Sequence, residues 1–396
     1  MTLPAVLDLA QALIACPSVT PEDGGALESI RARLLPLGFC CEAIDRNATR
    51  NLWARRGTKV PLFCFAGHVD VVPPGPLDAW TSPPFVPTLR DGFLYGRGAA
   101  DMKASLAAML VAAENFIQSN PVHPGSIAFL LTSDEEGDAR DGTLAVVETL
   151  KARGETIDYC VVGEPTAVAR VGDTIKNGRR GSLSGRLKVK GAQCHIAYPE
   201  KGKNPIHALA PALTELVMTR WDEGNAYFSP TTWQVSNLHA GVGANNVIPA
   251  FVDVLFNFRF SPASAPECLQ ARFTEILEKY ALDYELDWTL GAQPFLTRQG
   301  ELAEAAREAI RETTGLIPGF STTGGTSDAR FIAEICPQLL EIGPVNATSH
   351  QIDECVAIDA LPTLTRIHER ILERMLGNNP GEPNTQEAVS KIESGG

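Results

Sequence analysis

Histidine and carboxylate residues follow short apolar runs of this sequence. His68 and Asp70 come directly after the apolar run Leu62–Phe65, and the adjacent Glu135 and Glu136 come after a second such run. Imidazole nitrogens and carboxylate oxygens, with no thiolate among them, are typical ligands of zinc in catalytic sites. These side chains could therefore hold a metal ion that activates a water molecule.

Three further residues occupy similar positions. Asp101 precedes an expected helix, Glu164 follows the apolar run Tyr159–Val162, and His350 follows the expected strand Gln338–Glu341 after a loop. Ligands of an open α/β sheet bind at the carboxyl ends of its strands, so these segments should bring their side chains to one edge. The set is large enough for two metal ions, about 3.5–4 Å apart, that share a bridging carboxylate.

The adjacent pair Glu135 and Glu136 could divide two tasks. Neighbouring side chains of an extended segment point in opposite directions, so one could bind metal while the other carries a proton. Each motif also has an ordinary interpretation when it is taken alone. His68 could be a hydrogen-bonded histidine, Asp101 a helix N-cap, and the two glutamates a solvated acidic turn.

The first half of the chain alternates strand and helix patterns. Leu62–Phe65, Ile127–Thr132 and Tyr159–Val162 are short apolar runs typical of buried strands, and Met102–Gln118 has apolar residues at helical spacing. This alternation predicts an α/β layer with a largely parallel sheet.

The pattern changes near Gly181. Ser182–Lys190 alternates apolar and polar residues, as in a strand with one wet face. It opens a β-α-β-β-α-β order, which predicts a compact two-layer α+β unit inserted into the larger domain. The elements expected to follow are Pro205–Trp221, Thr232–Leu238, Phe251–Phe260, Pro266–Tyr280 and Asp283–Thr289. After Gln293 the α/β character returns, with an expected helix at Leu302–Thr313.

A chain of 396 residues is too long for one ordinary core, so two domains are expected. The predicted catalytic domain has a first part at 1–180 and a second part at 293–376, with an inserted domain at 181–292. Residues 377–396 lack an apolar period and are expected to be disordered.

Composition narrows the classes of partner. The formal net charge of −13 argues against nucleic acid and anionic membranes as partners, although local arginines could still bind an anionic substrate. Nine cysteines without paired spacing favour free thiols in a reducing compartment, so a cytoplasmic location is expected. No apolar run approaches the roughly 18 residues that span a bilayer, and the N-terminus lacks the basic region of a signal peptide.

Several segments together resemble the metal-dependent aminoacylase and carboxypeptidase family in order and spacing. They are GHVDVVPPG, LYGRGAADMKAS, TSDEEGD, VVGEPT and SHQIDE, and the resemblance runs from about Leu7 to about Leu376. A second set of segments resembles the branch of this family that removes a succinyl group from an amino acid. These are GRRGSLSGRLKVKG, HIAYPEKGKNPIH, NNVIP, FNFRFSP and STTGGTSDARF. The family fold is an α/β zinc-peptidase-like catalytic domain with an inserted dimerisation domain.

The resemblance implies two Zn²⁺ ions per subunit, for which Co²⁺ can substitute. His68 and Glu164 would bind one ion, Glu136 and His350 would bind the other, and Asp101 would bridge them.

The same resemblance implies roles beyond the ligands. Asp70 would accept a hydrogen bond from the ring of His68 and fix its tautomer, and Glu135 would be the general base. The family's homodimer would bring His195 of one subunit into the other subunit's active site, where it would stabilise the oxyanion. Cys194 stands where glycine is expected, which adds bulk to the turn before His195.

Substrate contacts are also implied by the resemblance. The expected residues are Arg179, Ser182, Asn245, Arg259, Gly325, Thr326 and Asn346. Either Asn245 or Asn246 could face the ligand, and the spacing to the following Val-Ile-Pro favours Asn245. Arg179 and Arg180 could be a solvated basic pair, but one arginine beside the expected domain junction suits a carboxylate ligand. Arg259 lies in an apolar strand and therefore needs a buried anionic partner, for which the substrate is one candidate.

The implied reaction is hydrolysis of N-succinyl-LL-2,6-diaminopimelate to succinate and LL-2,6-diaminopimelate, in the synthesis of lysine and cell-wall precursors. A sister activity, such as acetylornithine deacetylase or a dipeptidase, would use the same metal ligands with a different pocket. A catalytically inactive metal-binding or scaffold protein is a more distant alternative, and the presence of Asp101 and Glu135 argues against it.

Overall fold

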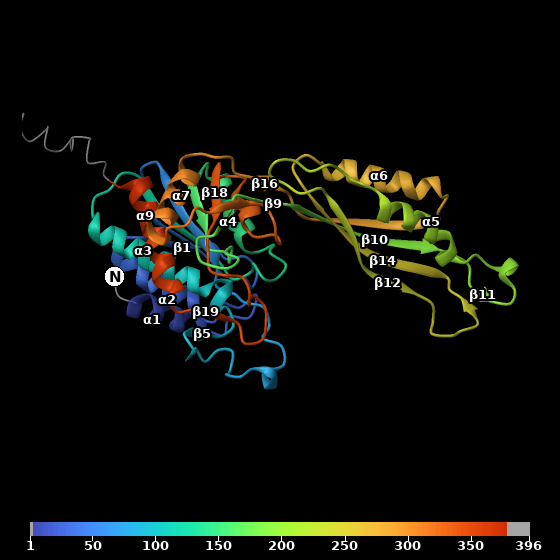
Figure 1. Ribbon diagram of the computed structural model, residues 1–396, viewed down its shortest axis with the longest axis horizontal. Helices are drawn as coiled ribbons and strands as arrows, with labels where there is room; N and C mark the ends of the chain where they lie inside the picture. Colours follow the sequence, from blue (N-terminus) through green and yellow to red (C-terminus); the bar gives the residue numbers. More distant parts are fainter. Residues whose placement is uncertain (1–2, 378–396) are drawn as a thin grey trace, which may run out of the picture. The chain divides into compact units, whose positions relative to one another are not determined.

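The computed structural model describes residues 3–377 and divides the chain into two compact units (Figure 1). The second unit comprises Gly178–Leu296 and Ser321–Thr326, and the other described residues belong to the first. The expected insert at 181–292 is therefore three residues short at its start and four short at its end. Of the segment 377–396, expected to be disordered, residues 378–396 lie outside the described range.

The short segment Ser321–Thr326 joins the second unit although it was expected in the second part of the catalytic domain. Hydrogen bonds explain the difference. Thr322 Oγ1 donates to the backbone oxygen of Tyr227 at 2.6 Å. The guanidinium of Arg179 donates to the backbone oxygens of Thr323 at 3.3 Å and Gly325 at 3.2 Å.

An eight-stranded sheet forms the centre of the first unit. The neighbouring strands β6, β3, β7 and β18 are parallel, whereas β1, β2 and β8 pair antiparallel on either side of them. The predicted mostly parallel sheet is confirmed, and its central strands are buried on both faces, as parallel strands usually are. In sheet order the strands are β1 (Cys40–Ala43), β2 (Asn51–Arg56), β6 (Ser126–Thr132), β3 (Leu62–His68), β7 (Tyr159–Val162), β18 (Gln338–Glu341), β8 (Thr174–Lys176) and β17 (Gly319–Ser321).

Helices pack around this sheet and complete its core. The helix α3 is buried along most of its length and packs against α1 and α9. None of the helices in residues 3–377 is long and apolar enough to cross a membrane. The helices are α1 (Leu3–Ile14), α2 (Ala26–Leu34), α3 (Ala104–Ser119), α4 (Thr143–Ala152), α7 (Glu301–Thr314), α8 (Ala329–Ile332) and α9 (Ala360–Leu376). A small sheet joins β4 (Thr88–Arg90), β5 (Phe93–Tyr95) and β19 (Cys355–Ala357).

The second unit is a four-stranded antiparallel sheet with two helices on one face (Figure 1). Its main elements follow the predicted β-α-β-β-α-β order, so this part of the fold is confirmed. They are β10 (Gly181–Lys190), α5 (Pro205–Met218), β12 (Thr232–Ala240), β14 (Phe251–Phe260), α6 (Pro266–Lys279) and β15 (Tyr284–Ala292). Two short ribbons accompany them: β11 (Cys194–His195) pairs with β13 (Val247–Ile248), and β9 (Gly178–Arg179) pairs with β16 (Phe295–Leu296).

Strand alternation decides which face of this unit is apolar. Phe256 and Phe258 of β14 point into the core beneath the helices, whereas Leu255 lies on the opposite face and is 39% exposed. Phe273 of α6 is fully buried, and its ring stacks on that of Phe256 with 4.6 Å between centroids. Such aromatic pairs add to the stabilisation that burial alone supplies.

Replacing Phe273 with alanine should therefore destabilise the second unit. Loss of a fully buried aromatic ring costs about 3–5 kcal/mol of unfolding free energy. Leu255→Ala, on the open face of the same sheet, should cost only about 0.5 kcal/mol. Urea unfolding followed by tryptophan fluorescence measures both values, and equal costs would contradict this assignment of the two faces.

Candidate metal centre

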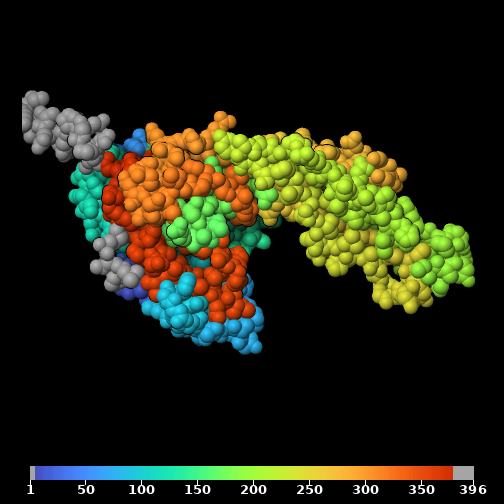
Figure 2. All heavy atoms as spheres, in the orientation of Figure 1, coloured from blue at the N-terminus to red at the C-terminus, as the bar shows by residue number. Residues whose placement is uncertain are grey.

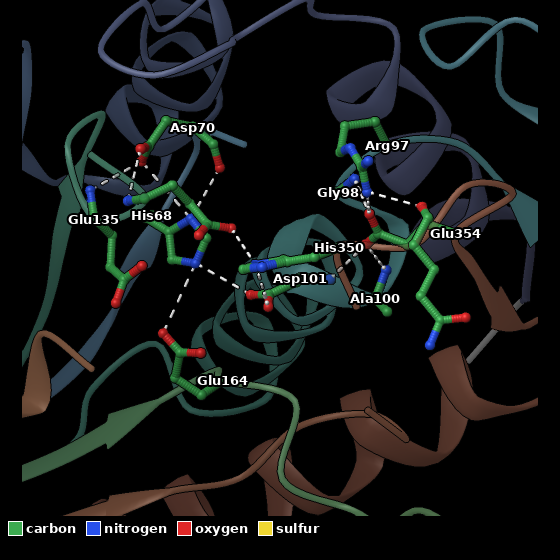
Figure 3. A network of polar contacts seen from close by, with 12 residues as sticks. His68, Asp70, Arg97, Gly98, Ala100, Asp101, Glu135, Glu164, His350 and Glu354 are labelled. Atoms are coloured by element: carbon green, nitrogen blue, oxygen red, sulfur yellow. Dashed lines mark hydrogen bonds and ion pairs between the residues drawn. The ribbon is translucent and has the colours of Figure 1, made fainter. Parts of the chain in front are cut away.

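Three adjacent parallel strands deliver the first part of the site. His68 is the last residue of β3, Glu135 and Glu136 follow β6, and Glu164 comes two residues after β7. Because β6, β3 and β7 are neighbours that run in the same direction, their carboxyl ends meet at one edge of the sheet. Figure 3 shows the side chains of His68, Glu135 and Glu164 gathered there.

Asp101 lies between two histidines (Figure 3). Its Oδ1 is 3.3 Å from Nε2 of His68, and its Oδ2 is 3.4 Å from Nε2 of His350. Glu164 Oε1 lies 3.7 Å from the same nitrogen of His68, and Glu136 Oε1 lies 2.9 Å from that of His350. The structure thus brings the five expected ligands into two groups of three that share Asp101, each with its ligand atoms within 4.8 Å of one another.

Glu135 is close to the same centre. One of its carboxylate oxygens lies within 4.8 Å of ligand atoms of His68 and Glu136. Burial, and next the charge of Glu164, raise the pKa of Glu135 well above its usual range. A carboxylate beside a metal site, with an elevated pKa, is suited to take and return a proton.

The electrostatics of the cluster indicate an excess of negative charge. Burial lowers the pKa of His68, but Asp101 and the other carboxylates outweigh it and hold this pKa well above its usual range. Hydrogen bonds to Asp101 and Glu136 raise the pKa of His350 to about 10. Positive charge is therefore stabilised at this position, and a divalent cation would supply it.

The residues fit a divalent metal ion on two further grounds. Nε2 of His68 is buried and has no hydrogen-bond partner of good geometry within residues 3–377. The donor set is imidazole nitrogen and carboxylate oxygen, which zinc accepts in catalytic sites.

Asp70 makes different contacts from those expected. Nδ1 of His68 donates to the backbone oxygen of Asp70 at 2.9 Å, whereas the carboxylate oxygen Oδ1 is 3.7 Å away. That carboxylate instead accepts the backbone N–H groups of Glu135 at 3.3 Å and Glu136 at 3.1 Å. Asp70 thus fixes the tautomer of His68 through its main chain and holds the glutamate segment through its side chain.

The expected substrate contacts are divided between the two units. Asn346 lies in the first unit and is exposed, and the other six lie in the second. Within the second unit Arg179 contacts Gly325, and Ser182 lies opposite Arg259 in the β10–β14 pair. Thr326 is half-buried at the end of the 321–326 segment.

Arg259 and Arg180 are positively charged groups that form no ion pair with a carboxylate within the described part of the chain. Nε of Arg180 is buried there without a hydrogen bond. Burial, and next the charge of Arg180, lower the pKa of Arg259. The two residues therefore attract an anion, and Arg180 joins the expected residues as a candidate.

Asn245 and His195 lie near the β11–β13 ribbon. Asn245 is exposed, and the backbone oxygen of Asn246 accepts the N–H of Ile196 at 3.0 Å. Nδ1 of His195 accepts the N–H of Ala197 at 3.1 Å, and its ring lies beside that of Tyr198 with 5.7 Å between centroids. This ribbon is at the end of the second unit away from β9 and β16 (Figure 1), and the light-green atoms around it form an exposed projection (Figure 2).

Two buried acidic residues near the centre were not singled out from the sequence. Burial raises the pKa of Asp328 to about 6, and its charge contributes to the elevated pKa of Glu135. Glu354 is fully buried and hydrogen bonds to the backbone of Asp101. The SHQIDE and STTGGTSDARF segments contain both residues, but neither follows a strand directly, so strand position could not indicate them.

These features define a two-unit α/β protein with a candidate two-metal centre at the edge of its sheet. Residues 64–374 match the peptidase family M20/M25/M40, and the chain belongs to this family.

Two curated relatives illustrate the similarity. The succinyl-diaminopimelate desuccinylase of Dechloromonas aromatica is 68% identical over 93% of this chain and 98% of its own. That of Azoarcus sp. strain BH72 is 62% identical over 95% of this chain and 100% of its own.

Solved structures share the fold at low identity. An M20 family metallo-carboxypeptidase of Sulfolobus solfataricus superposes with a TM-score of 0.77 at 17% identity, covering 93% of this chain and 98% of that one. A dinuclear metal-binding M20 peptidase of Bacillus subtilis gives a TM-score of 0.70 at 16% identity, covering 94% and 98%.

The shared position of Asp101 predicts how metal binding responds to mutation. Asp101→Asn should weaken zinc binding at both candidate ligand groups, whereas Glu164→Gln should weaken it only at the group that contains His68. Loss of a ligand should lower the metal affinity by more than loss of the hydrogen-bond partner of a ligand does, which is typically about 10–100-fold. Calorimetric titration of the metal-free protein with Zn²⁺ measures both sites.

Asp134→Asn is the matched control for these variants. The carboxylate of Asp134 accepts the backbone N–H groups of Arg140 and Asp141, both at 3.1 Å, and belongs to neither ligand group. Its zinc titration should match that of the unmodified chain. An Asp101→Asn variant that lost only one ion would show that this carboxylate is not shared.

Proposed function

We propose that this protein is a metal-dependent amidohydrolase that cleaves N-succinyl-LL-2,6-diaminopimelate to succinate and LL-2,6-diaminopimelate. The observation that carries the proposal is the carboxylate of Asp101 between His68 and His350, in a chain whose relatives at 60–68% identity bear the desuccinylase name. Those relatives match over nearly their whole length, so no large part of their chains lacks a counterpart here.

Two zinc ions, with Co²⁺ as a possible substitute, are the proposed cofactors. His68, Glu164 and Asp101 would hold one ion, and His350, Glu136 and Asp101 the other. Bound divalent ions would supply the positive charge that polarises an amide carbonyl and lowers the pKa of a water molecule.

Glu135 is the proposed proton carrier. It would take a proton as water adds to the amide carbon, and it would return a proton to the nitrogen as the C–N bond breaks. Its position beside His68 and its elevated pKa support this role. Asp70 would keep Glu135 in place, because it accepts the backbone N–H of that residue.

The substrate carries several carboxylates, which need countercharges on the protein. Arg259 and Arg180 are candidates, because neither has a carboxylate partner within residues 3–377. Charged hydrogen bonds from arginine to carboxylate are among the strongest that proteins form. Arg179 would act beside them, and it also holds the loop that carries Gly325. Ser182, Asn245, Thr326 and Asn346 remain proposed contacts.

A homodimer in the cytoplasm is the proposed working form. Strand β12 is at an edge of the four-stranded sheet, and its Leu238 is 45% exposed. An edge strand of this kind can pair with a second copy of the chain. The cytoplasmic location remains a prediction from the cysteine pattern.

A substrate comparison tests the proposed activity. The purified protein with zinc should hydrolyse N-succinyl-diaminopimelate with a higher kcat/KM than N-acetylornithine. Glu135→Gln should retain zinc and lose about 10²–10⁴-fold in kcat, the usual contribution of a general base. Preference for N-acetylornithine or for a dipeptide would replace the proposed substrate, and a fully active Glu135→Gln variant would exclude Glu135 as the base.

A mixed-dimer experiment tests the role proposed for His195 in the neighbouring subunit. His195→Ala alone should lose about 10²–10³-fold in turnover, as for other oxyanion donors. Mixing it with Glu135→Gln under subunit exchange should restore activity, because one site of each mixed dimer then holds both groups. Mixed dimers that form but remain inactive would show that His195 serves its own subunit.

A further inference from the structure

Glu354 is a fully buried acidic residue in the first unit, and Arg97 is the side chain among the described residues that donates to its carboxylate. Its Oε2 accepts from the guanidinium of Arg97 at 2.7 Å and from the N–H of Gly98 at 2.9 Å. Its Oε1 accepts from the N–H groups of Ala100 and Asp101, both at 2.9 Å. Four donors from one short segment therefore converge on a single carboxylate (Figure 3).

Arg97 ties the same segment to the loop that follows His350. Its guanidinium donates to the backbone oxygen of Gln351 at 3.1 Å as well as to Glu354, and it lies 5.1 Å from the centroid of the Trp80 ring. Arg97 is only 2% exposed. A backbone hydrogen bond from Gly96 N to Glu354 O, at 3.0 Å, adds a further link.

The two segments joined in this way carry two of the candidate ligands. One segment runs from Arg97 to Asp101, and Glu354 holds the backbone N–H of Asp101 itself. The other is the loop that contains His350, whose φ of 64° is a backbone conformation that non-glycine residues seldom adopt. Such a conformation persists only where surrounding contacts hold it.

We infer that Glu354, paired with Arg97, is a positioning residue that sets the distance between Asp101 and His350 and thereby the affinity of the metal centre. The inference rests on the metal centre of the proposed function. Glu354 acts on the protein and not on the substrate, because within residues 3–377 its carboxylate accepts hydrogen bonds from Arg97 and from the backbone N–H groups of Gly98, Ala100 and Asp101.

A purely structural role is the competing explanation. Breaking a buried ion pair is destabilising wherever it lies, because one charge is left without its partner. The two explanations differ in metal binding. Loss of a purely structural pair would lower the melting temperature alone. Loss of a positioning residue would also lower the affinity for zinc in protein that remains folded.

Glu354→Gln is the test variant, because its amide nitrogen would place a donor against two donors, either those of Arg97 and Gly98 or those of Ala100 and Asp101. Titration of the metal-free full chain with Zn²⁺ should show affinity lowered by about 10–100-fold, the usual cost of removing a partner that orients a ligand. The visible absorption of the Co²⁺-loaded variant should change as well, because the ligand arrangement around the ion changes.

Glu114→Gln is the matched control. Glu114 forms a two-pronged pair with Arg33 between α3 and α2, and it belongs to no ligand group. This variant should lower the melting temperature and leave zinc affinity and the Co²⁺ spectrum unchanged. If Glu354→Gln behaves in the same way, the inference is overturned.

Arg97→Lys covers the case in which Glu354→Gln does not fold. It keeps the buried cation but loses the guanidinium Nη1 that donates to both Glu354 and Gln351, so zinc should bind about 10-fold more weakly. Unchanged zinc affinity in this variant would also overturn the inference. Failure of the unmodified chain to bind zinc would instead remove the proposed metal centre, so the two failures are distinguishable.

Discussion

The carboxylate of Asp101 faces two histidines at once, with one oxygen 3.3 Å from His68 and the other 3.4 Å from His350. A single residue can do this only if its backbone is held while its side chain reaches between two segments far apart in sequence. The hydrogen bonds that the backbone N–H groups of Ala100 and Asp101 donate to the carboxylate of Glu354 supply that restraint. The grouping of the candidate ligands into two sets depends on it.

The central sheet holds His68 and the glutamates at fixed positions. The central strands β3, β6 and β7 are buried on both faces, so their carboxyl ends cannot shift without disturbing the core. His68 and the glutamates at these ends therefore keep their spacing although carboxylates repel one another. Burial, and next the charge of Glu164, raise the pKa of Glu135. Burial lowers the pKa of His68, but the carboxylates hold it above its usual range, and hydrogen bonds to Asp101 and Glu136 raise the pKa of His350, so bound cations would be stabilised here.

The second unit carries two partly buried arginines. Arg259 and Arg180 are unpaired with carboxylates in residues 3–377, in a chain whose formal net charge is −13. Partial burial of an arginine without a countercharge costs folding free energy unless an anion binds to it. An acidic chain can thus bind an anionic substrate, provided that a few arginines are kept from internal ion pairs.

The sequence by itself determined the element types and indicated the five candidate ligands. His68 ends β3, Glu136 and Glu164 come within four residues of the ends of β6 and β7, Asp101 precedes α3, and His350 follows β18 after a loop. It also determined the β-α-β-β-α-β order of the second unit, through the alternation seen in β10 and β14. Only the tertiary structure decided that Asp70 contacts His68 through its main chain, that Arg179 holds the loop at Gly325, and that Glu354 holds Asp101. Periodicity reports which face of an element is buried, whereas these contacts join residues from separate loops whose approach depends on how the whole unit packs.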